Sequence, residues 1–119
     1  MQVQDSTGAV NWIPLTDHEL LEKIREHSFI RPQLIFKHST RCSISSLALS
    51  RMEKGPTSPL VDYYFLDLLR YRNLSDRVAE TYAVPHESPQ VLVIREGECR
   101  YEESHLQIDP QEIWQEVSS

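Results

Sequence analysis

A chain of 119 residues is long enough for one domain with its own hydrophobic core, and its composition is that of an ordinary globular protein. The formal net charge of −6 argues against a protein that binds nucleic-acid backbones or anionic membranes. No apolar stretch approaches the ~18 residues of a transmembrane helix, and the N-terminus lacks a signal-peptide pattern, so we expect a cytoplasmic protein.

Thiols and potential metal ligands are few and scattered. Cys42 and Cys99 lie far apart in the sequence, and a structural disulfide is a poor expectation in a reducing compartment. The five histidines, at positions 18, 27, 38, 86 and 105, include no pair with the short spacing of a zinc site. We therefore expect no metal and no bound cofactor.

The chain begins with a weakly patterned segment. Residues 1–10 lack periodicity and are expected to form a flexible tail, which leaves 11–119 as the domain. A short edge strand can cover 11–15, because Pro14 excludes a central position in a sheet.

A well-marked helix start follows. Thr16 and Glu19 have the spacing of a capping box, with Thr16 as the N-cap, and the helix should fade between 27 and 31. The residues expected on its buried face are Leu20, Leu21 and Ile24.

The middle of the chain predicts a buried strand that leads into a helix. The strand is expected at 34–37, and Cys42 lies where the helix begins. The apolar residues that recur at helical spacing are Ile44, Leu47, Ala48 and Met52. Gly55 followed by Pro56 should end this helix. A thiolate at Cys42 would be stabilised by the positive end of the helix dipole.

The second half predicts two more strands in a hairpin. We expect a strand at 61–66, a helix from about 73 or 75 to 83, strands at 91–94 and 98–103, and a helix that opens with Asp109 and Pro110. Cys99 and Tyr101 should share one face of the return strand. Strands separated by helices should be parallel and the late pair antiparallel, which predicts an α/β fold with a mixed sheet flanked by helices.

The motif around Cys42 is C-x-x-S, in which Ser45 replaces the second thiol of a dithiol motif. A hydroxyl cannot complete an intramolecular disulfide, but it can donate a hydrogen bond to a thiolate. An exposed helix serine is an equally good interpretation of Ser45. The predicted topology puts Cys99 at the opposite end of the sheet, so Cys99 is expected to be a small core residue.

The order of elements, the cysteine at a helix start and Pro89 before a strand resemble the thioredoxin fold. Residues 37–45 and 86–91, with Ser104-His105, resemble the monothiol bacilliredoxin (YtxJ-like) family, and the likeness runs from about residue 11 to 109. One departure is Ser43, which stands where many members of that family have proline. The resemblance implies that the Ser88–Pro89 bond is cis and lies close to Cys42.

The same resemblance implies a cytoplasmic bacterial thiol-disulfide oxidoreductase. It would remove bacillithiol, a low-molecular-weight thiol of some bacteria, from mixed disulfides on client proteins, with bacillithiol as co-substrate. Cys42 would be the catalytic nucleophile, and Ser88 and Pro89 would bind substrate. The residues expected to support the active site are Thr40, Arg41, Ser43 and Ser45. Arg41 could steer an anionic co-substrate or be a solvated charge.

Two other functions fit the same residues. One is a glutaredoxin-like monothiol reductase that uses another small thiol, and the other is a redox-inactive module that binds extended peptides in the Ser88–Pro89 groove. Iron–sulfur ligation has no support besides Cys42. His38 and His86 are expected to be structural hydrogen-bonding residues, and Lys37 with Arg41 is too small a set for a binding patch.

Overall fold

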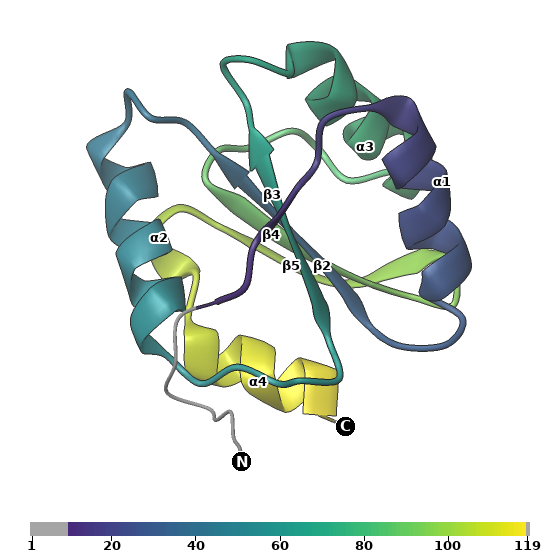
Figure 1. The fold of residues 1–119 in the computed structure, drawn as a ribbon. Coiled ribbons are helices and arrows are strands. Elements are labelled where there is room, and N and C mark those ends of the chain that lie inside the picture. The colour runs from purple at the N-terminus through teal and green to yellow at the C-terminus, as the bar shows by residue number, and fades with distance from the viewer. Residues whose placement is uncertain (1–9, 119) are drawn as a thin grey trace.

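In the computed structural model, which describes residues 10–118, one mixed sheet lies between layers of helices (Figure 1). The strands are β1 (Ile13–Pro14), β2 (Gln33–His38), β3 (Asp62–Asp67), β4 (Gln90–Arg95) and β5 (Glu98–Ser104). The helices are α1 (His18–His27), α2 (Ser43–Lys54), α3 (Arg72–Tyr82) and α4 (Pro110–Ser118), with a 3-10 turn η1 (His105–Gln107) before α4.

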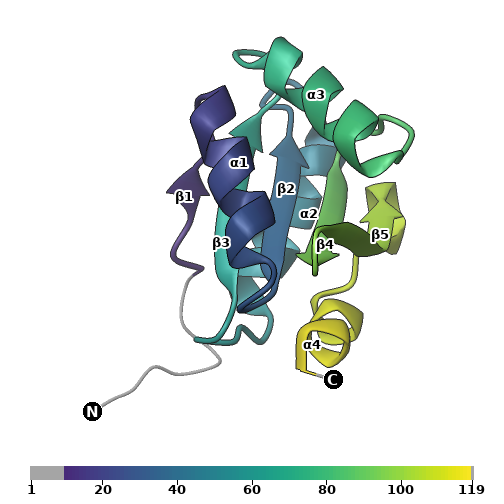
Figure 2. The same cartoon turned by 90° about the vertical axis from the view of Figure 1, so that its right-hand side faces the viewer.

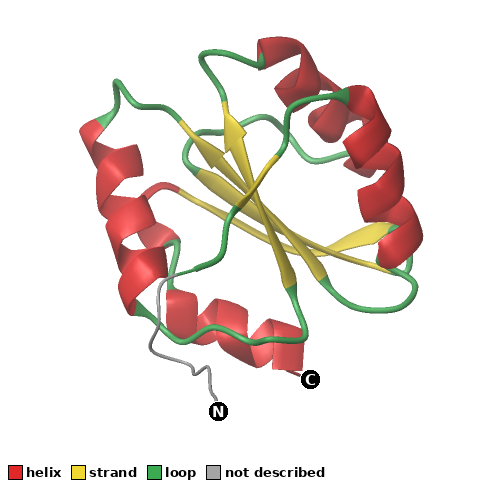
Figure 3. Cartoon of the chain, in the orientation of Figure 1, coloured by secondary structure: helices red, strands yellow, loops and turns green. Residues whose placement is uncertain are grey.

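The sheet order is β1-β3-β2-β4-β5, with β2 in the centre. β3 is parallel to both β1 and β2, whereas β4 is antiparallel to β2 and to β5. The predicted parallel early strands and late hairpin are therefore confirmed. Helices α1 and α3 cover one face of the sheet and α2 lies behind it, so the molecule has three layers (Figures 2 and 3).

All six residues of β2 are buried, because helices cover the sheet on both faces. Leu34 and Phe36 join a core with residues of α2 and α4, such as Met52. Ile35, on the other face, joins a core with residues of α1 and α3, such as Val78. The continuous apolar run of the sequence is thus a central strand that contributes alternately to two cores.

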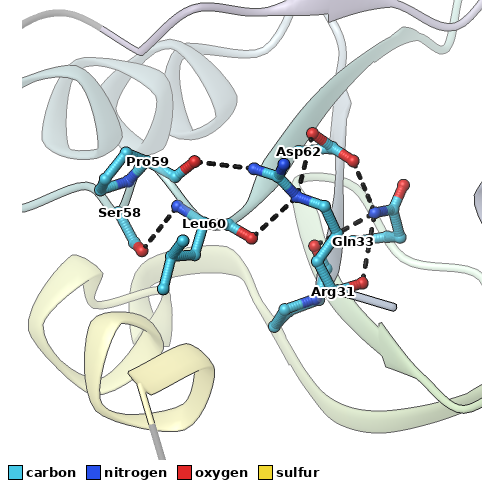
Figure 4. A network of polar contacts seen from close by, with 7 residues as sticks. Arg31, Gln33, Ser58, Pro59, Leu60 and Asp62 are labelled. Carbon is cyan, nitrogen blue, oxygen red and sulfur yellow. Dashed lines mark hydrogen bonds and ion pairs between the residues drawn. The ribbon is translucent and has the colours of Figure 1, made fainter. Parts of the chain in front are cut away.

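At the edge where β2 and β3 begin, a polar network joins the α1–β2 turn to the α2–β3 loop (Figure 4). Arg31 donates from Nη2 to the Pro59 carbonyl at 2.7 Å and from Nε to the Leu60 carbonyl at 3.0 Å. The buried Gln33 amide donates to Asp62 Oδ2 at 2.7 Å, and Arg31 Nε lies 3.5 Å from Asp62 Oδ1. This network fastens two loops that are distant in sequence.

Helix α1 begins one residue later than predicted. Its N-cap is Asp17, whose extended backbone (φ −155°) lets Oδ1 accept a hydrogen bond of 3.0 Å from the Leu20 N–H. Thr16, the predicted N-cap, lies outside the helix, so the predicted capping box is wrong. Thr and Asp are both good caps, and the sequence alone does not choose between adjacent ones.

Helix α2 presents a different face to the core than predicted. Its buried residues are Ser45, Ala48 and Met52. Ile44 and Leu47, which share helical spacing with Ala48 and Met52, remain 37% and 46% exposed, so the four residues do not all face the core. Ser45, a polar residue, takes a core position because its hydroxyl has hydrogen-bond partners there.

Gly55 ends α2 as predicted, but its conformation is one that any residue adopts (φ −88°, ψ 179°). A Cβ atom at Gly55 would clash with the Pro110 side chain. The glycine is therefore required by the close approach of α4 and not by a left-handed cap.

A bulge in the hairpin alters the faces of β5. Tyr101 pairs with Val93, and Cys99 pairs with the next residue, Ile94, because the register shifts between them. Cys99 consequently packs against the α1 and α3 core and Tyr101 against the α2 and α4 core. The prediction that they share a face is wrong.

Residues 1–9 of the predicted tail lie outside the described residues, and Val10 is buried in the core at 7% exposure. Among residues 10–118, no helix combines the length and apolarity that crossing a bilayer would require.

Candidate active site

Cys42 is the N-cap of α2, at the end of the loop that leaves the central strand β2. Its N–H donates to the Ser39 carbonyl at 3.1 Å, and its carbonyl accepts from the Ser46 N–H at 3.1 Å, so the loop is a closed turn. The side chain is partly exposed, and the first turn of α2 carries no acidic residue. This places an accessible sulfur at the positive end of a helix, where a negative charge is favoured.

Three of the predicted support residues flank Cys42 directly. Thr40, Arg41 and Ser43 are all exposed, Thr40 and Arg41 in the turn and Ser43 in the first position of α2. The predicted role of Arg41 toward an anionic co-substrate stays a prediction.

Ser45 is fully buried and joins the end of β2 to α2. Its Oγ accepts a hydrogen bond of 3.0 Å from the Ser39 N–H and lies 2.7 Å from His38 Nδ1. Burial lowers the pKa of His38, so its ring is neutral near pH 7, and the Ser45 hydroxyl can donate to Nδ1. The structure thus gives the serine of the C-x-x-S motif two partners in the protein, and its role toward the Cys42 sulfur stays a prediction.

The Ser88–Pro89 peptide bond is cis, as the resemblance implied. The strand register places this bond beside the Cys42 loop. Gln90, the residue after Pro89, pairs with Lys37, and β2 ends one residue later at His38, where the Cys42 loop begins. Pro89 is buried, and its carbonyl accepts from the His105 N–H at 3.0 Å. The Ser88 hydroxyl is buried and has no hydrogen-bond partner among residues 10–118. The predicted substrate-binding pair therefore lies at the same sheet edge as the nucleophile.

A buried lysine at this edge was not predicted to belong to the site. Lys37 has no exposed surface, and its Nζ lies 3.4 Å from His86 Nδ1. The Ser75 Oγ atom lies 3.2 Å from the same nitrogen. Burial lowers the pKa of Lys37 to about 8, an effect that the charge of Asp76 opposes.

His86 links this lysine to the cis-proline loop. Burial, followed by the charges of Lys37 and Arg72, lowers the pKa of His86, although the residue as a whole is exposed. A lysine at an interior position of a continuous apolar strand was the available signal in the sequence. The alternation of side chains along a strand points it to the face opposite Phe36, toward α3.

His105 and Glu87 border the site on the β5 side. The His105 Nε2 atom lies 3.3 Å from Glu87 Oε1, and each side chain is 46% exposed. His105 has a left-handed backbone (φ 58°), which turns the chain from β5 into η1 and brings its N–H to Pro89. These two residues connect the cis-proline loop to the last strand.

Cys99 lies at the other edge of the sheet, as predicted. It pairs through Ile94 with Gln33, the first residue of β2, whereas Cys42 follows the last residue of β2. At about 3.3 Å per residue, this separation exceeds the span of a disulfide. Neither cysteine forms a disulfide, and burial raises the pKa of Cys99. Cys99 is not placed to resolve a disulfide at Cys42.

The described part of the chain contains no group of three His, Cys, Asp or Glu side chains that could hold a metal ion. The arrangement at the sheet edge instead fits thiol chemistry. One accessible sulfur lies at a helix start, beside a cis-proline loop with an unused hydroxyl, and the second cysteine is out of reach.

Comparisons with known proteins agree with this geometry. The structure is similar to one described as a candidate oxidoreductase with a thioredoxin fold, with a TM-score of 0.74 and 29% identity over 87% of this chain and 91% of that chain. It is also similar to a thioredoxin of Malassezia sympodialis (TM-score 0.71, 11% identity, 99% and 95% covered) and one of Schistosoma mansoni (TM-score 0.69, 11% identity, 90% and 93% covered).

These likenesses show that the fold is thioredoxin-like. The sequence of residues 13–113 matches the family described as monothiol bacilliredoxin BrxC. That match spans most of the chain, including Cys42 and the Ser88–Pro89 loop. The chain belongs to the monothiol bacilliredoxin family.

Proposed function

We propose that this protein removes bacillithiol from mixed disulfides on protein cysteines, in the cytoplasm of a bacterium that makes this thiol. The observation that carries the proposal is Cys42, a partly exposed thiol at the start of α2 in a chain of the bacilliredoxin family. Fold and family together support thiol redox chemistry, and the family name supports bacillithiol as the small thiol.

The first step is an exchange at sulfur. The Cys42 thiolate attacks the bacillithiol sulfur of the mixed disulfide, a new S–S bond forms between Cys42 and bacillithiol, and the client leaves as a thiolate that takes a proton from water. The disulfide is transferred and not reduced in this step. The positive end of α2 supports the attacking sulfur.

The second step needs a thiol from solution. A second molecule of bacillithiol, as thiolate, attacks the bacillithiol sulfur bound to Cys42, which releases bacillithiol disulfide and the Cys42 thiolate. Cys99 does not take this role, because it lies at the opposite edge of the sheet. The two bacillithiol molecules thus leave oxidised as a pair, and the client leaves reduced.

The test compares two cysteine variants on a bacillithiol-modified client protein. Cys42→Ser should reduce the release of bacillithiol to the uncatalysed background, because no other thiol reaches the substrate. Cys99→Ser is the matched control and should retain wild-type release. Activity that persists in Cys42→Ser contradicts the proposal.

A parallel assay decides which small thiol is used. The same client carrying glutathione should be a poorer substrate than the client carrying bacillithiol. Equal rates would favour a glutaredoxin-like reductase of broader specificity. No exchange with either client, together with retained peptide binding, would favour a redox-inactive binding module.

A further inference from the structure

The loop that carries the cis-proline is attached to β2 through Lys37. An ammonium group only donates hydrogen bonds, so His86 Nδ1, 3.4 Å from Lys37 Nζ, is the acceptor and the ring proton lies on Nε2. The Ser75 hydroxyl approaches the same nitrogen from α3 at 3.2 Å. His86 is therefore held by two elements at once.

The end of the same loop is also tied to the neighbourhood of Lys37. Gln90 pairs with Lys37 across the strands, and its amide donates to the Pro85 carbonyl at 3.1 Å. The Gln90 Oε1 atom is buried and has no hydrogen-bond partner in the part of the chain that is described. Side chains opposite each other in a strand pair share a face, so Gln90 lies on the same face of the sheet as Lys37.

Stability alone does not explain a lysine at this position. Burying an ammonium is costly unless it is paired with a carboxylate in good geometry, and the nearest acidic influence, Asp76, acts only as a charge at longer range. The neighbours of Lys37 on its strand face, Ile35 and Leu92, are apolar and fully buried. An apolar side chain would pack there without this penalty.

Lys37 connects the strand that leads to Cys42 with the loop that carries the cis-proline. Lys37 lies five residues before Cys42 on the strand that leads to the nucleophile, and His86 lies two residues before Ser88 on the loop that faces it. The contact between them crosses from one half of the candidate site to the other. Two further hydrogen bonds of the loop, with Gln90 and His105, join it to β4 and η1.

We propose that Lys37 is a positioning residue which, through His86, fixes the Ser88–Pro89 loop relative to Cys42 and so sets the affinity for the mixed-disulfide client. The inference rests on the proposed function for its substrate. It goes beyond that function by assigning client affinity to a buried charge that does not touch the client.

The first test is Lys37→Met, which keeps an unbranched side chain and removes the charge. We expect KM for a bacillithiol-modified client to rise about tenfold, the value of one charge-assisted hydrogen bond, with kcat little changed. The rate at which iodoacetamide alkylates Cys42 should stay the same, because this small reagent does not use the loop. The exposed Lys23→Met is the matched control and should change none of these values.

The second test asks whether Lys37 acts through His86. His86→Ala should raise KM to a similar extent, and the double variant Lys37→Met/His86→Ala should be no worse than either single variant. If the increase in KM of the double variant were the product of the two single increases, Lys37 and His86 would act independently, and the proposal would be overturned.

The pH dependence of KM supplies a readout that a packing role would not change. The charged and titratable groups that face His86 are Lys37 from β2, Arg72 and Asp76 from α3, and Glu87 from its own loop. Of these, Lys37 loses its proton at about pH 8. Wild-type KM should therefore rise above about pH 8, and Lys37→Met should lack that rise.

A substrate-free measurement separates this inference from the proposed function. The charge of Lys37 lowers the pKa of His86, so Lys37→Met should raise that pKa in an NMR titration and speed amide exchange at Ser88. An unchanged titration and exchange, or alkylation of Cys42 that slows in parallel with turnover, would overturn the positioning role. An inactive wild-type protein whose His86 titration still responds to Lys37→Met would overturn only the proposed function.

Discussion

The two edges of the sheet hold their polar groups in different ways. At the edge where β2 begins, the Arg31 guanidinium lies beside the Asp62 carboxylate and donates to two main-chain carbonyls of the α2–β3 loop (Figure 4). At the edge where β2 ends, Lys37 and His38 are buried, and they contact a histidine ring and a serine hydroxyl instead of carboxylates.

This difference distinguishes a structural edge from the edge that carries the candidate site. In the Arg31–Asp62 network, opposite charges and carbonyls satisfy one another, so the network contributes to stability. At the Cys42 edge, burial lowers the pKa of Lys37, His38 and His86, which means that their charged forms are disfavoured in the folded state. Groups of this kind cost stability and are typical of functional sites.

The largest expected effect tests whether Lys37 costs stability. Its pKa is about 8 in the folded state and 10.5 as a model value, so the unfolded chain binds more protons between these limits. Stability should therefore rise with pH from about 8 to about 10.5, and the penalty is fully present below pH 8. Lys37→Met should remove the penalty, with a gain in unfolding free energy on the order of 3 kcal/mol at pH 7.

Urea unfolding of both proteins between pH 7 and 10.5 measures this effect. The buried tyrosines Tyr63 and Tyr82 have raised pKa values and weaken both proteins at high pH, so the informative quantity is the difference between the two curves. That difference should shrink above pH 8. Curves that stay parallel would show that the lysine carries no burial penalty. Lys23→Met, on the surface of α1, is the matched control.

The second effect tests the structural edge. Asp62→Ala removes an acceptor of the buried Gln33 amide and the carboxylate beside Arg31. We expect a loss of about 2–3 kcal/mol in unfolding free energy, the cost of losing hydrogen bonds to a charged group. Turnover of a modified client should be unchanged, because the network lies a strand length from Cys42.

Thermal or urea unfolding and a turnover assay of the same preparation provide the two readouts. Glu80→Ala on the exposed side of α3 is a suitable control, with little expected change in either readout. If the folded Asp62→Ala variant turned over the client more slowly than wild type, the two edges would be coupled. That result would contradict the assignment of the Arg31–Asp62 network to stability alone.

Much of the fold followed from the pattern of apolar residues. The run from Leu34 to Phe36 and the spacing of Leu74 and Val78 mark a central strand and a helix that the structure contains. The errors have local causes. A bulge shifts Cys99 to the other face of β5, and two adjacent capping residues, Thr16 and Asp17, compete for one helix start.

The candidate site was predictable only in part. Cys42 at a helix start and Pro89 before a strand follow from order and composition, and the family match covers both. The contact between Lys37 and His86 joins residues 49 positions apart. Such a contact depends on the register of β2 with β4 and on the turn after α3, which periodicity does not define. The partners of Ser45, the Ser39 N–H and the His38 ring, depend instead on the conformation of the loop between β2 and α2, which periodicity also does not define.

The smallest effect concerns Ser45, for which the sequence left two interpretations. Ser45→Ala leaves the Ser39 N–H and His38 Nδ1 without their partner at a buried joint. We expect a loss of about 1–2 kcal/mol in unfolding free energy. The Ser45 hydroxyl donates to Nδ1 of the neutral ring and so favours the neutral form, and the variant should therefore also raise the pKa of His38 in an NMR titration.

Ser46→Ala provides a control one residue away, since Ser46 is exposed on the same helix. The interpretation of Ser45 as an exposed helix serine is wrong, because Ser45 is fully buried. The alkylation rate of Cys42 shows whether the buried hydroxyl serves the sulfur or the joint with His38. If the hydroxyl serves the joint with His38, the rate in Ser45→Ala stays at the wild-type value while stability falls. A slower rate at unchanged stability would instead show that the Ser45 hydroxyl stabilises the Cys42 thiolate. Ser45 would then act on the reactivity of the nucleophile and not on the stability of the fold.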